Sequence, residues 1–245
     1  MRVFGKPLKR WQINALLLLA VLALPFVLLL TRPTPPPAVP VCLLTGFEPF
    51  GGHSVNSSWE MLKPLEGQTV AGHRVATARL PVVYDEVAGP LQAAIEKHRP
   101  ALVISFGMGT EVVQVELVAR NGYHLARPED NLGRGPPREK IVPGGPDEIP
   151  TQLPAAEIIR ALQAAGIGAG DSDDADGYLC NECFYRVMSL KKEGAAANVV
   201  RRGFVHVPVL GWPDPAGGQY TLEKLERAAR IIIQQTAAGA AHGSP

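Results

Sequence analysis

Residues 41–46 read VCLLTG, a short apolar run that ends at a glycine. A run of this length predicts a buried strand that feeds a turn, and a strand entering a glycine-bearing loop often delivers a functional site. Further strands are expected where β-branched residues gather between Gly, Pro or polar residues. These stretches are residues 74–80, 101–106, 112–119 and 203–210.

Apolar residues recur at helical spacing between the predicted strands. The helical patterns lie at residues 84–98, 154–165 and 221–235. Because strands alternate with helices, the pattern indicates an α/β domain. We expect this domain to span residues 41–235 and the small-residue tail, residues 236–245, to be disordered.

The first forty residues differ from the rest of the chain. Several basic side chains precede an apolar run, residues 15–30, that has no charged or strongly polar side chain. Extended to residues 11–31, the run reaches the length that a bilayer core demands. It exits into prolines rather than into a small-residue cleavage site, which favours an uncleaved membrane anchor over a signal peptide for residues 1–31. A stiff Pro-rich linker, residues 32–40, is expected to follow.

The charges beside the apolar run also predict a location. Basic residues before a membrane span keep the N-terminus in the cytoplasm. We therefore expect a membrane-anchored protein whose main domain lies outside the cytoplasm, on the periplasmic side if the chain is bacterial. If the segment is cleaved, the domain is exported instead.

Length, charge and cysteine count limit the classes of protein to which this chain can belong. A chain of 245 residues is long enough for one substantial domain but not comfortably for two. With 24 Lys and Arg against 23 Asp and Glu, there is no electrostatic reason to expect a nucleic-acid partner. Three cysteines are too few for a disulfide scaffold, and the odd number leaves at least one thiol free in any intramolecular pairing.

Two irregular segments stand apart from the predicted elements. Residues 127–150 are rich in Pro, Gly and charges and are too long for a simple connector, so we expect them to cover a site. Residues 171–176 contain four aspartates. A solvated loop is the favoured interpretation, because the spacing lacks the ligand pattern of a calcium loop, and no metal site is predicted.

Cys180 lies in the stretch GYLCNECFY, residues 177–185. After Gly177 the apolar residues follow a helical spacing, which places Cys180 in the first turn of a helix. Unpaired amide groups and the positive end of the helix dipole favour a thiolate, the nucleophilic form of cysteine. A single cysteine is more often a small buried apolar residue, so a catalytic role requires partners.

His206 and Glu116 are the candidate partners. His206 interrupts the apolar stretch FVHVP, residues 204–208, where it is either a hydrogen-bonded core histidine or a base for the Cys180 proton. Glu116 is the candidate carboxylate to orient the imidazole. An outward-facing glutamate in an alternating strand would need no such partner. On the residues alone, both interpretations stay open.

Together these segments resemble the pyroglutamyl peptidase I (pyrrolidone-carboxylate peptidase) family. Residues 45–52, TGFEPFGG, followed by Asn56, are close to the family's opening signature. Residues 115–121 are similar to its E-R-V-A-x-N strand, and residues 177–185 resemble its G-x-[FY]-[VL]-C-N-x-x-x-Y segment. Residues 204–208 resemble F-[IV]-H-[VI]-P, and the motifs occur in the family's order.

The resemblance extends from residue 41 to about residue 212. It implies a three-layer α/β/α sandwich with a central mixed sheet, and a peptidase that removes N-terminal pyroglutamyl residues from peptides without metal or organic cofactor. By matched position, Cys180 is its nucleophile, His206 its base and Glu116 its third catalytic residue. The matched substrate-binding positions are Phe47, Phe50, Tyr178, Leu179 and, after a one-residue insertion, Arg127. Relatives often assemble as oligomers, so a homo-oligomer is an open expectation.

The chain departs from the family at two positions. Met108 replaces a glutamine that relatives carry near the substrate, and Leu117 replaces an arginine. These changes prompt one alternative, a membrane-tethered pseudoenzyme or peptide-binding protein. The C-x-x-C formed by Cys180 and Cys183 prompts another, a thiol-disulfide oxidoreductase, although a thioredoxin-like context is lacking.

Overall fold

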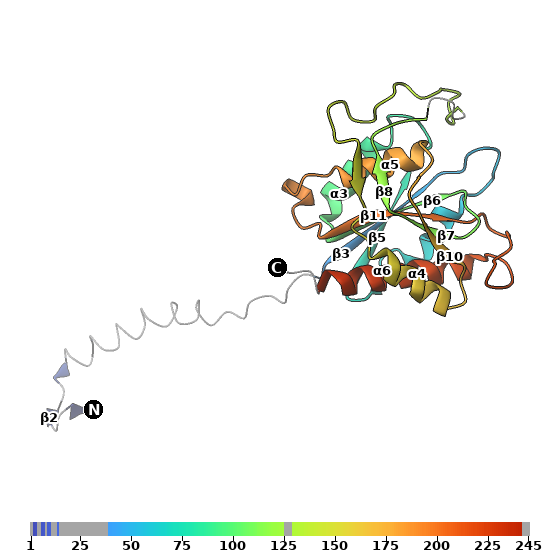
Figure 1. Ribbon diagram of the computed structural model, residues 1–245. Helices are drawn as coiled ribbons and strands as arrows, with labels where there is room; N and C mark the ends of the chain where they lie inside the picture. Colours follow the sequence, from blue (N-terminus) through green and yellow to red (C-terminus); the bar gives the residue numbers. More distant parts are fainter. Residues whose placement is uncertain are drawn as a thin grey trace. The chain divides into compact units, whose positions relative to one another are not determined.

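The computed structural model describes residues 2–3, 6–7, 9–10, 14, 39–124 and 129–241 (Figure 1). The chain divides into two units, residues 1–38 and 39–245. In the first unit, strands β1 (Arg2–Val3) and β2 (Lys6–Pro7) pair antiparallel. The second unit carries all the candidate catalytic residues.

The apolar run predicted to anchor the chain, residues 15–30, and residues 32–38 of the predicted linker lie outside the described residues. Among the helices that the structure does describe, none combines the length and the apolar character needed to cross a bilayer.

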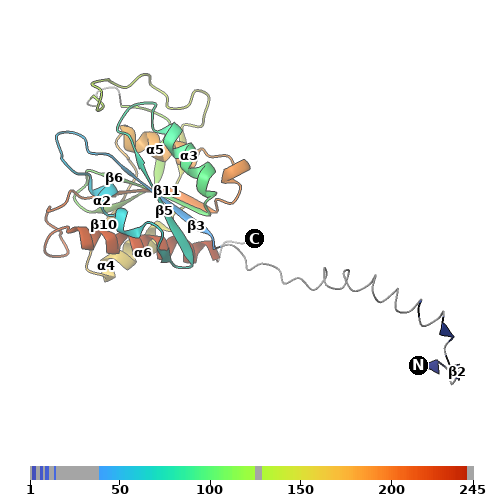
Figure 2. The same ribbon diagram turned by 180° about the vertical axis from the view of Figure 1, so that it is seen from behind.

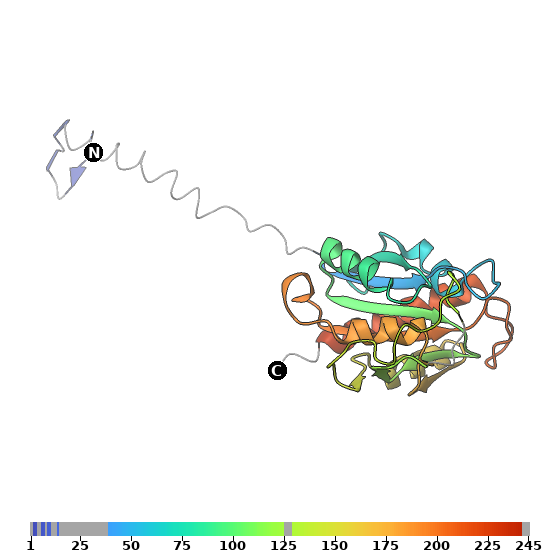
Figure 3. The ribbon, with the colours of Figure 1, turned by 90° about the horizontal axis from the view of Figure 1, so that it is seen from above.

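A mixed sheet with the strand order β10-β7-β11-β6-β3-β5-β4 forms the centre of the second unit. Its strands are β3 (Val41–Phe47), β4 (Thr69–Val70), β5 (His73–Leu80), β6 (Leu102–Met108), β7 (Val113–Glu116), β10 (Ala169–Ser172) and β11 (Arg201–Val207). Strands β5, β3, β6 and β11 are parallel, whereas β7 runs antiparallel to β11. Figure 3 shows β3 and β6 side by side. The carboxyl ends of β3, β6 and β11 therefore meet at one edge, where ligands bind in many α/β sheets.

Four of the predicted strands are confirmed as β3, β5, β6 and β11. The strand predicted at residues 112–119 is instead two strands, because the chain leaves the large sheet at Leu117. The N–H of Leu117 still donates to the carbonyl of Ser172 on β10 at 2.7 Å, but its carbonyl accepts from the N–H of Thr151, next to β9, at 2.8 Å. Strand β8 (Val118–Arg120) then pairs with β9 (Glu148–Pro150) in a separate small sheet.

Helices cover both faces of the large sheet (Figure 1). They are α2 (Ser57–Glu60), α3 (Ala88–His98), α4 (Ala155–Ala164), α5 (Leu179–Met188) and α6 (Leu222–Ala241). Helices α3 and α5 pack on one apolar cluster with Leu43, while α4 and α6 pack on another with Leu44, since successive strand residues point to opposite faces. Helices α4 and α6 lie side by side, as Figure 2 shows from behind. The predicted α/β class is confirmed.

Two helices differ from their predicted bounds. Helix α3 begins at Ala88 rather than at residue 84, because Asp85 has a φ of 63°, which an α-helix does not admit. Helix α6 continues through residues 236–241, so the prediction that this part of the tail is disordered is wrong. Residues 242–245 lie outside the described part.

Candidate active site

Cys180 lies in the first turn of α5, as its sequence context predicted. The helix begins after Tyr178, whose backbone is extended, with φ of −102° and ψ of −159°. Backbone N–H groups in a first turn have no acceptor within the helix, and the helix dipole is positive there. Cys180, a partly buried free cysteine, therefore lies among backbone N–H groups that have no acceptor within the helix.

Asn181 fixes the start of α5 against strand β8. Its Oδ1 accepts from the N–H of Arg120 at 3.1 Å, and its Nδ2 donates to the carbonyls of Arg120 at 2.9 Å and Gly122 at 2.8 Å. The side chain is buried, and both ends of the amide are paired with backbone. The residue after Cys180 therefore anchors the helix that carries the thiol.

Strand β6 passes directly against Cys180 at Gly107. A Cβ atom built on Gly107 would lie 2.6 Å from Sγ of Cys180, 2.9 Å from Cζ of Phe204 and 3.0 Å from Cδ2 of His206. Glycine is required here because any side chain would collide with the thiol. The same crowding brings Cys180 and His206 together.

His206 lies beside Glu116 on the face of the sheet that carries α5. Nδ1 of His206 is 2.7 Å from Oε1 of Glu116, and the two side chains are 8% and 1% exposed. Burial by itself lowers the pKa of His206, but the Cys180 sulfur, which also hydrogen-bonds the ring, and the Glu116 carboxylate together raise it to about 10. The site therefore favours the protonated, imidazolium form of His206.

A cavity of about 360 Å³ opens over these residues, in the size range of small-molecule sites. Its wall is formed by Phe50, Met108, Gly109, Thr110, Gln114, Glu116, Asp174, Ala175, Asp176, Tyr178, Cys180 and His206. The cavity thus joins the three candidate catalytic residues to two of the aromatic side chains identified from the sequence, Phe50 and Tyr178.

The remaining predicted substrate residues lie elsewhere. Phe47 and Leu179 are buried in the core, 2% and 1% exposed, and are not among the residues that line the cavity. Arg127 lies outside the described residues. Of the predicted substrate-binding residues that the structure describes, Phe50 and Tyr178 therefore line the cavity, whereas Phe47 and Leu179 lie in the core.

Hydrogen bonds hold the loop that presents Phe50. Oδ1 of Asn56 caps α2 by accepting from the N–H of Ser58 at 3.0 Å and from its hydroxyl at 2.7 Å. Nδ2 of Asn56 donates to the carbonyl of Glu48 at 3.0 Å, and Oε1 of Glu48 accepts from the N–H of Val82 at 3.0 Å. These contacts give the polar residues of the first sequence motif a positioning role.

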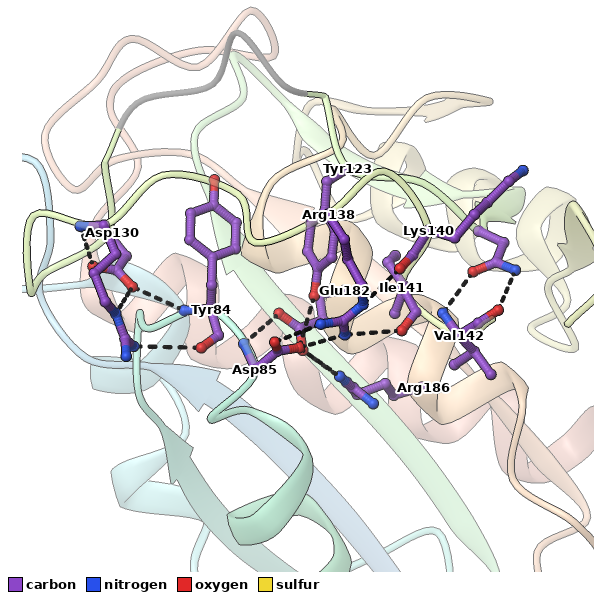
Figure 4. A network of polar contacts seen from close by, with 12 residues as sticks. Tyr84, Asp85, Tyr123, Asp130, Arg138, Lys140, Ile141, Val142, Glu182 and Arg186 are labelled. Carbon is purple, nitrogen blue, oxygen red and sulfur yellow. Dashed lines mark hydrogen bonds and ion pairs between the residues drawn. The ribbon is translucent and has the colours of Figure 1, made fainter. Parts of the chain in front are cut away.

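Ion pairs tie the segment 129–147 to α5 (Figure 4). Asp85 accepts from Nη1 and Nη2 of Arg138, at 2.6 and 2.5 Å, and from Nη2 of Arg186 at 3.3 Å. Nε of Arg186 donates to the buried Glu182 at 2.7 Å. One carboxylate therefore links Arg138, from the segment, with Arg186, from the helix that carries Cys180.

Asp130 anchors the same segment at its start. Its Oδ2 accepts from the N–H of Tyr84 and from Nε of Arg134, both at 3.0 Å. Its Oδ1 accepts from the N–H groups of Leu132 at 2.8 Å and Arg134 at 2.9 Å. Burial opposes the charge, but these hydrogen bonds outweigh it and lower the pKa of Asp130.

Cys183, the second cysteine of the C-x-x-C, is also free but has a different environment. It is fully buried, and burial is the main reason that its pKa is raised to about 12. A thiol that stays protonated is a poor partner for thiol-disulfide exchange. The geometry thus favours a single reactive cysteine over a redox pair.

Sequence reasoning overlooked Gln114 and Gly107. Gln114 precedes Glu116 by two positions, so strand alternation alone would have placed both side chains on one face. Gly107 gave no comparable signal, because its need for glycine arises from Cys180 and His206, which are distant in sequence.

Within the described part of the chain, no group of three or more His, Cys, Asp or Glu side chains is arranged to hold a metal ion.

Comparison with known proteins gives one consistent family. The family model for pyroglutamyl peptidase matches residues 41–222. The chain is 40% identical to the pyrrolidone-carboxylate peptidase of Klebsiella pneumoniae (strain 342) over 204 residues, covering 79% of this chain and 93% of that protein. It is 41% identical to that of Gloeobacter violaceus over 170 residues, covering 69% of this chain and 81% of that protein. The crystal structure of Bacillus amyloliquefaciens pyroglutamyl peptidase I superposes with a TM-score of 0.73 at 32% identity, covering 81% of this chain and 97% of that one.

These relatives also correct one prediction. The relatives that match the chain, a pyrrolidone-carboxylate peptidase and pyroglutamyl peptidase I, contradict the prediction of a membrane-anchored protein whose catalytic domain lies outside the cytoplasm. We therefore abandon that location. The sequence motifs, the fold and the relatives agree that the chain belongs to the pyroglutamyl peptidase family of cysteine peptidases.

Proposed function

We propose that this chain removes N-terminal pyroglutamyl residues from peptides, with Cys180 as nucleophile, His206 as acid and base, and Glu116 as the group that orients His206. The observation that carries the proposal is the convergence of a thiol, an imidazole and a buried carboxylate on one cavity. Membership in the pyroglutamyl peptidase family supports the same reaction.

The first half of the proposed reaction forms an acyl-enzyme. The thiolate of Cys180 attacks the carbonyl carbon of the pyroglutamyl peptide bond, and a carbon–sulfur bond forms as the oxygen becomes an oxyanion. Backbone N–H groups in the first turn of α5 supply donors for this oxyanion. The imidazolium of His206 gives its Nε2 proton to the leaving amine as the carbon–nitrogen bond breaks, which leaves a thioester.

The second half restores the enzyme. Neutral His206 takes a proton from a water molecule whose oxygen attacks the thioester carbon. The carbon–sulfur bond then breaks, pyroglutamate leaves, and the thiolate and imidazolium are regenerated. Throughout, Glu116 accepts the Nδ1 proton of His206 in a hydrogen bond and stabilises its positive charge.

The cavity suits a flat, neutral lactam. Phe50 and Tyr178 line it with ring centroids 6.2 Å apart and planes at 42°, which offers the ring an aromatic wall. Phe47 and Leu179 are assigned to shaping this wall from the core side. Arg127 stays a prediction from the resemblance.

The proposed catalytic domain begins at residue 41, and residues 41–235 contain every residue assigned a role here. Helix α6 carries the fold on to Ala241. The family match, residues 41–222, falls within these limits.

Release of a fluorophore from a pyroglutamyl amide by the full chain under reducing conditions tests the proposal. We expect release by the parent and by Cys183→Ser, the matched change at the other cysteine of α5, and none by Cys180→Ala. A folded, reduced parent that releases nothing contradicts the proposed function. Release by Cys180→Ala would instead exclude Cys180 as the nucleophile.

A further inference from the structure

One polar side chain in the wall of the cavity has no role in the reaction described above. Gln114 lies on β7, and its Cα pairs in register with that of His206 on the antiparallel strand β11. Residues directly opposite in an antiparallel pair carry their side chains on the same face, with Cβ atoms about 5 Å apart. Gln114 therefore stands next to His206, and it lines the same cavity.

The other neutral polar side chains of the cavity are already engaged. The hydroxyl of Thr110 donates to the carbonyl of Val112 at 2.8 Å, and the hydroxyl of Tyr178 donates to the carbonyl of Glu129 at 3.1 Å. The sulfur of Met108 accepts from the N–H of Ser57 at 3.4 Å. Among the cavity residues that the structure describes, Gln114 is the neutral side chain whose donor and acceptor are both left without a protein partner.

The chemistry of the substrate ring matches this amide. In a five-membered lactam the N–H and the C=O are held cis and point to the same side of the ring. A primary carboxamide presents its C=O and one N–H along a single edge, so the two groups can form a pair of parallel hydrogen bonds. Carboxylates such as Asp174 can accept from the lactam N–H, but they cannot donate to its carbonyl.

We propose that Gln114 determines specificity by binding the lactam of the pyroglutamyl ring, with Oε1 accepting from the lactam N–H and Nε2 donating to the lactam carbonyl. This inference rests on the proposed function and adds the residue that distinguishes the ring. The same contact places the scissile carbonyl, which is attached beside the lactam nitrogen, toward Cys180. A ring without the lactam would leave the amide of Gln114 unpaired.

The test uses Gln114→Met in the full chain, because methionine keeps the length of the side chain and removes both hydrogen-bonding groups. Gln92→Met, the same change on the exposed face of α3, is the matched control. We expect kcat/KM for a pyroglutamyl amide to fall about 10- to 100-fold in Gln114→Met and to stay at the parent value in Gln92→Met. Gln114→Glu keeps the shape and loses the donor, so it should show a loss of the same order and covers the case in which Gln114→Met does not fold.

A second measurement does not depend on turnover. Cys180 is alkylated with iodoacetamide in the presence of 2-pyrrolidone, the free lactam ring, or of cyclopentanone, a ring of the same size that lacks the N–H. We expect 2-pyrrolidone to protect the parent and Gln92→Met better than cyclopentanone does, and the difference to disappear in Gln114→Met. The alkylation rate without a ring compound should match the parent, which shows that the nucleophile is intact.

The two measurements separate the two claims. If the parent releases no fluorophore, the proposed function fails, but protection that is lost in Gln114→Met still supports the lactam contact. The inference is overturned if Gln114→Met keeps kcat/KM within about twofold of the parent. Equal protection of the parent and Gln114→Met by 2-pyrrolidone, or no protection of the parent, overturns it as well.

Discussion

Nδ1 of His206 lies 2.7 Å from Oε1 of Glu116, although 90 positions separate the two residues in the chain. Both side chains are almost fully buried, and the second oxygen of Glu116 has no hydrogen-bond partner within the described structure. A buried carboxylate with one partner stays charged only if that partner carries a proton to share. The contact therefore indicates that Nδ1 of His206 carries a proton, and it fixes the orientation of the imidazole ring.

Replacing this carboxylate should change the pH dependence of the reaction. The pKa of His206 is raised to about 10 by Cys180 and Glu116 against the effect of burial, so the imidazolium that protonates the leaving amine is lost as the pH rises through that value. In Glu116→Gln we expect kcat/KM to fall about 10²- to 10⁴-fold and the alkaline limb to move down by about 1–3 pH units. A pH profile of kcat/KM measures both. An alkaline limb that stays in place would show that Glu116 does not act on His206.

Gly107 offers a test of the close approach between β6 and the thiol. In Gly107→Ala the new methyl group would lie 2.6 Å from Sγ of Cys180, so the sulfur must move. Because small displacements of a reacting group are costly, we expect kcat/KM to fall by about 10²-fold. The clash with the buried Phe204 ring should also lower the thermal midpoint. Gly89→Ala, in α3 with open space around its Cβ position, is the control and should keep the parent activity. Parent-like activity in Gly107→Ala would contradict the described geometry.

The sequence predicted local elements well because their signals are contiguous. The apolar run at residues 41–46 is a central strand, and the helical spacing after Gly177 does begin at the residue before Cys180. The contact between His206 and Glu116 was different. Periodicity within a strand does not reveal which strand lies beside it, so the pairing of β7 with β11 could not be predicted from the sequence.

The two phenylalanines of the first motif, Phe47 and Phe50, show a further limit of prediction from the sequence. Strand β3 continues through Phe47, which directs that ring into the core, whereas Phe50 follows the strand end and reaches the cavity. A matched motif gave both residues the same role. The contact of Asp85 with Arg138 and Arg186 could not be predicted either, because it joins two loops and a helix through charges that look like ordinary surface residues in the sequence.

The aromatic wall predicts how Phe50 contributes. Since Phe50 contacts the ring and not the reacting carbonyl in the proposed complex, Phe50→Ala should raise KM for a pyroglutamyl amide about tenfold and change kcat much less. Trp212→Ala removes an exposed aromatic side chain that does not line the cavity, and it serves as the control. Steady-state kinetics of both variants separate KM from kcat. A loss confined to kcat would place Phe50 in the chemical step rather than in binding.

Asp130 predicts how stability depends on pH. Its carboxylate accepts four hydrogen bonds from Tyr84, Leu132 and Arg134, its side chain is fully buried, and its pKa is lowered. A lowered folded-state pKa contributes stability that is present above the unfolded value, about 3.9, and is lost as the pH falls through the folded value. In Asp130→Asn, one side-chain oxygen can still accept hydrogen bonds, but the amide NH₂ group takes the place of the other oxygen and faces N–H donors.

Asp130→Asn should therefore lower the free energy of unfolding by about 1–3 kcal/mol at pH 7. The deficit should shrink as the pH falls below about 4, where the carboxylate of the unfolded parent begins to be protonated. Urea unfolding of both proteins between neutral and acid pH measures the difference. Asp147→Asn is the matched control, because Asp147 pairs with Lys140 on the surface, where solvent and salt screen the interaction, and little change is expected. A deficit that is the same at pH 3 as at pH 7 would mean that the charge of Asp130 does not hold the segment in place, since protonation of the parent would then cost nothing.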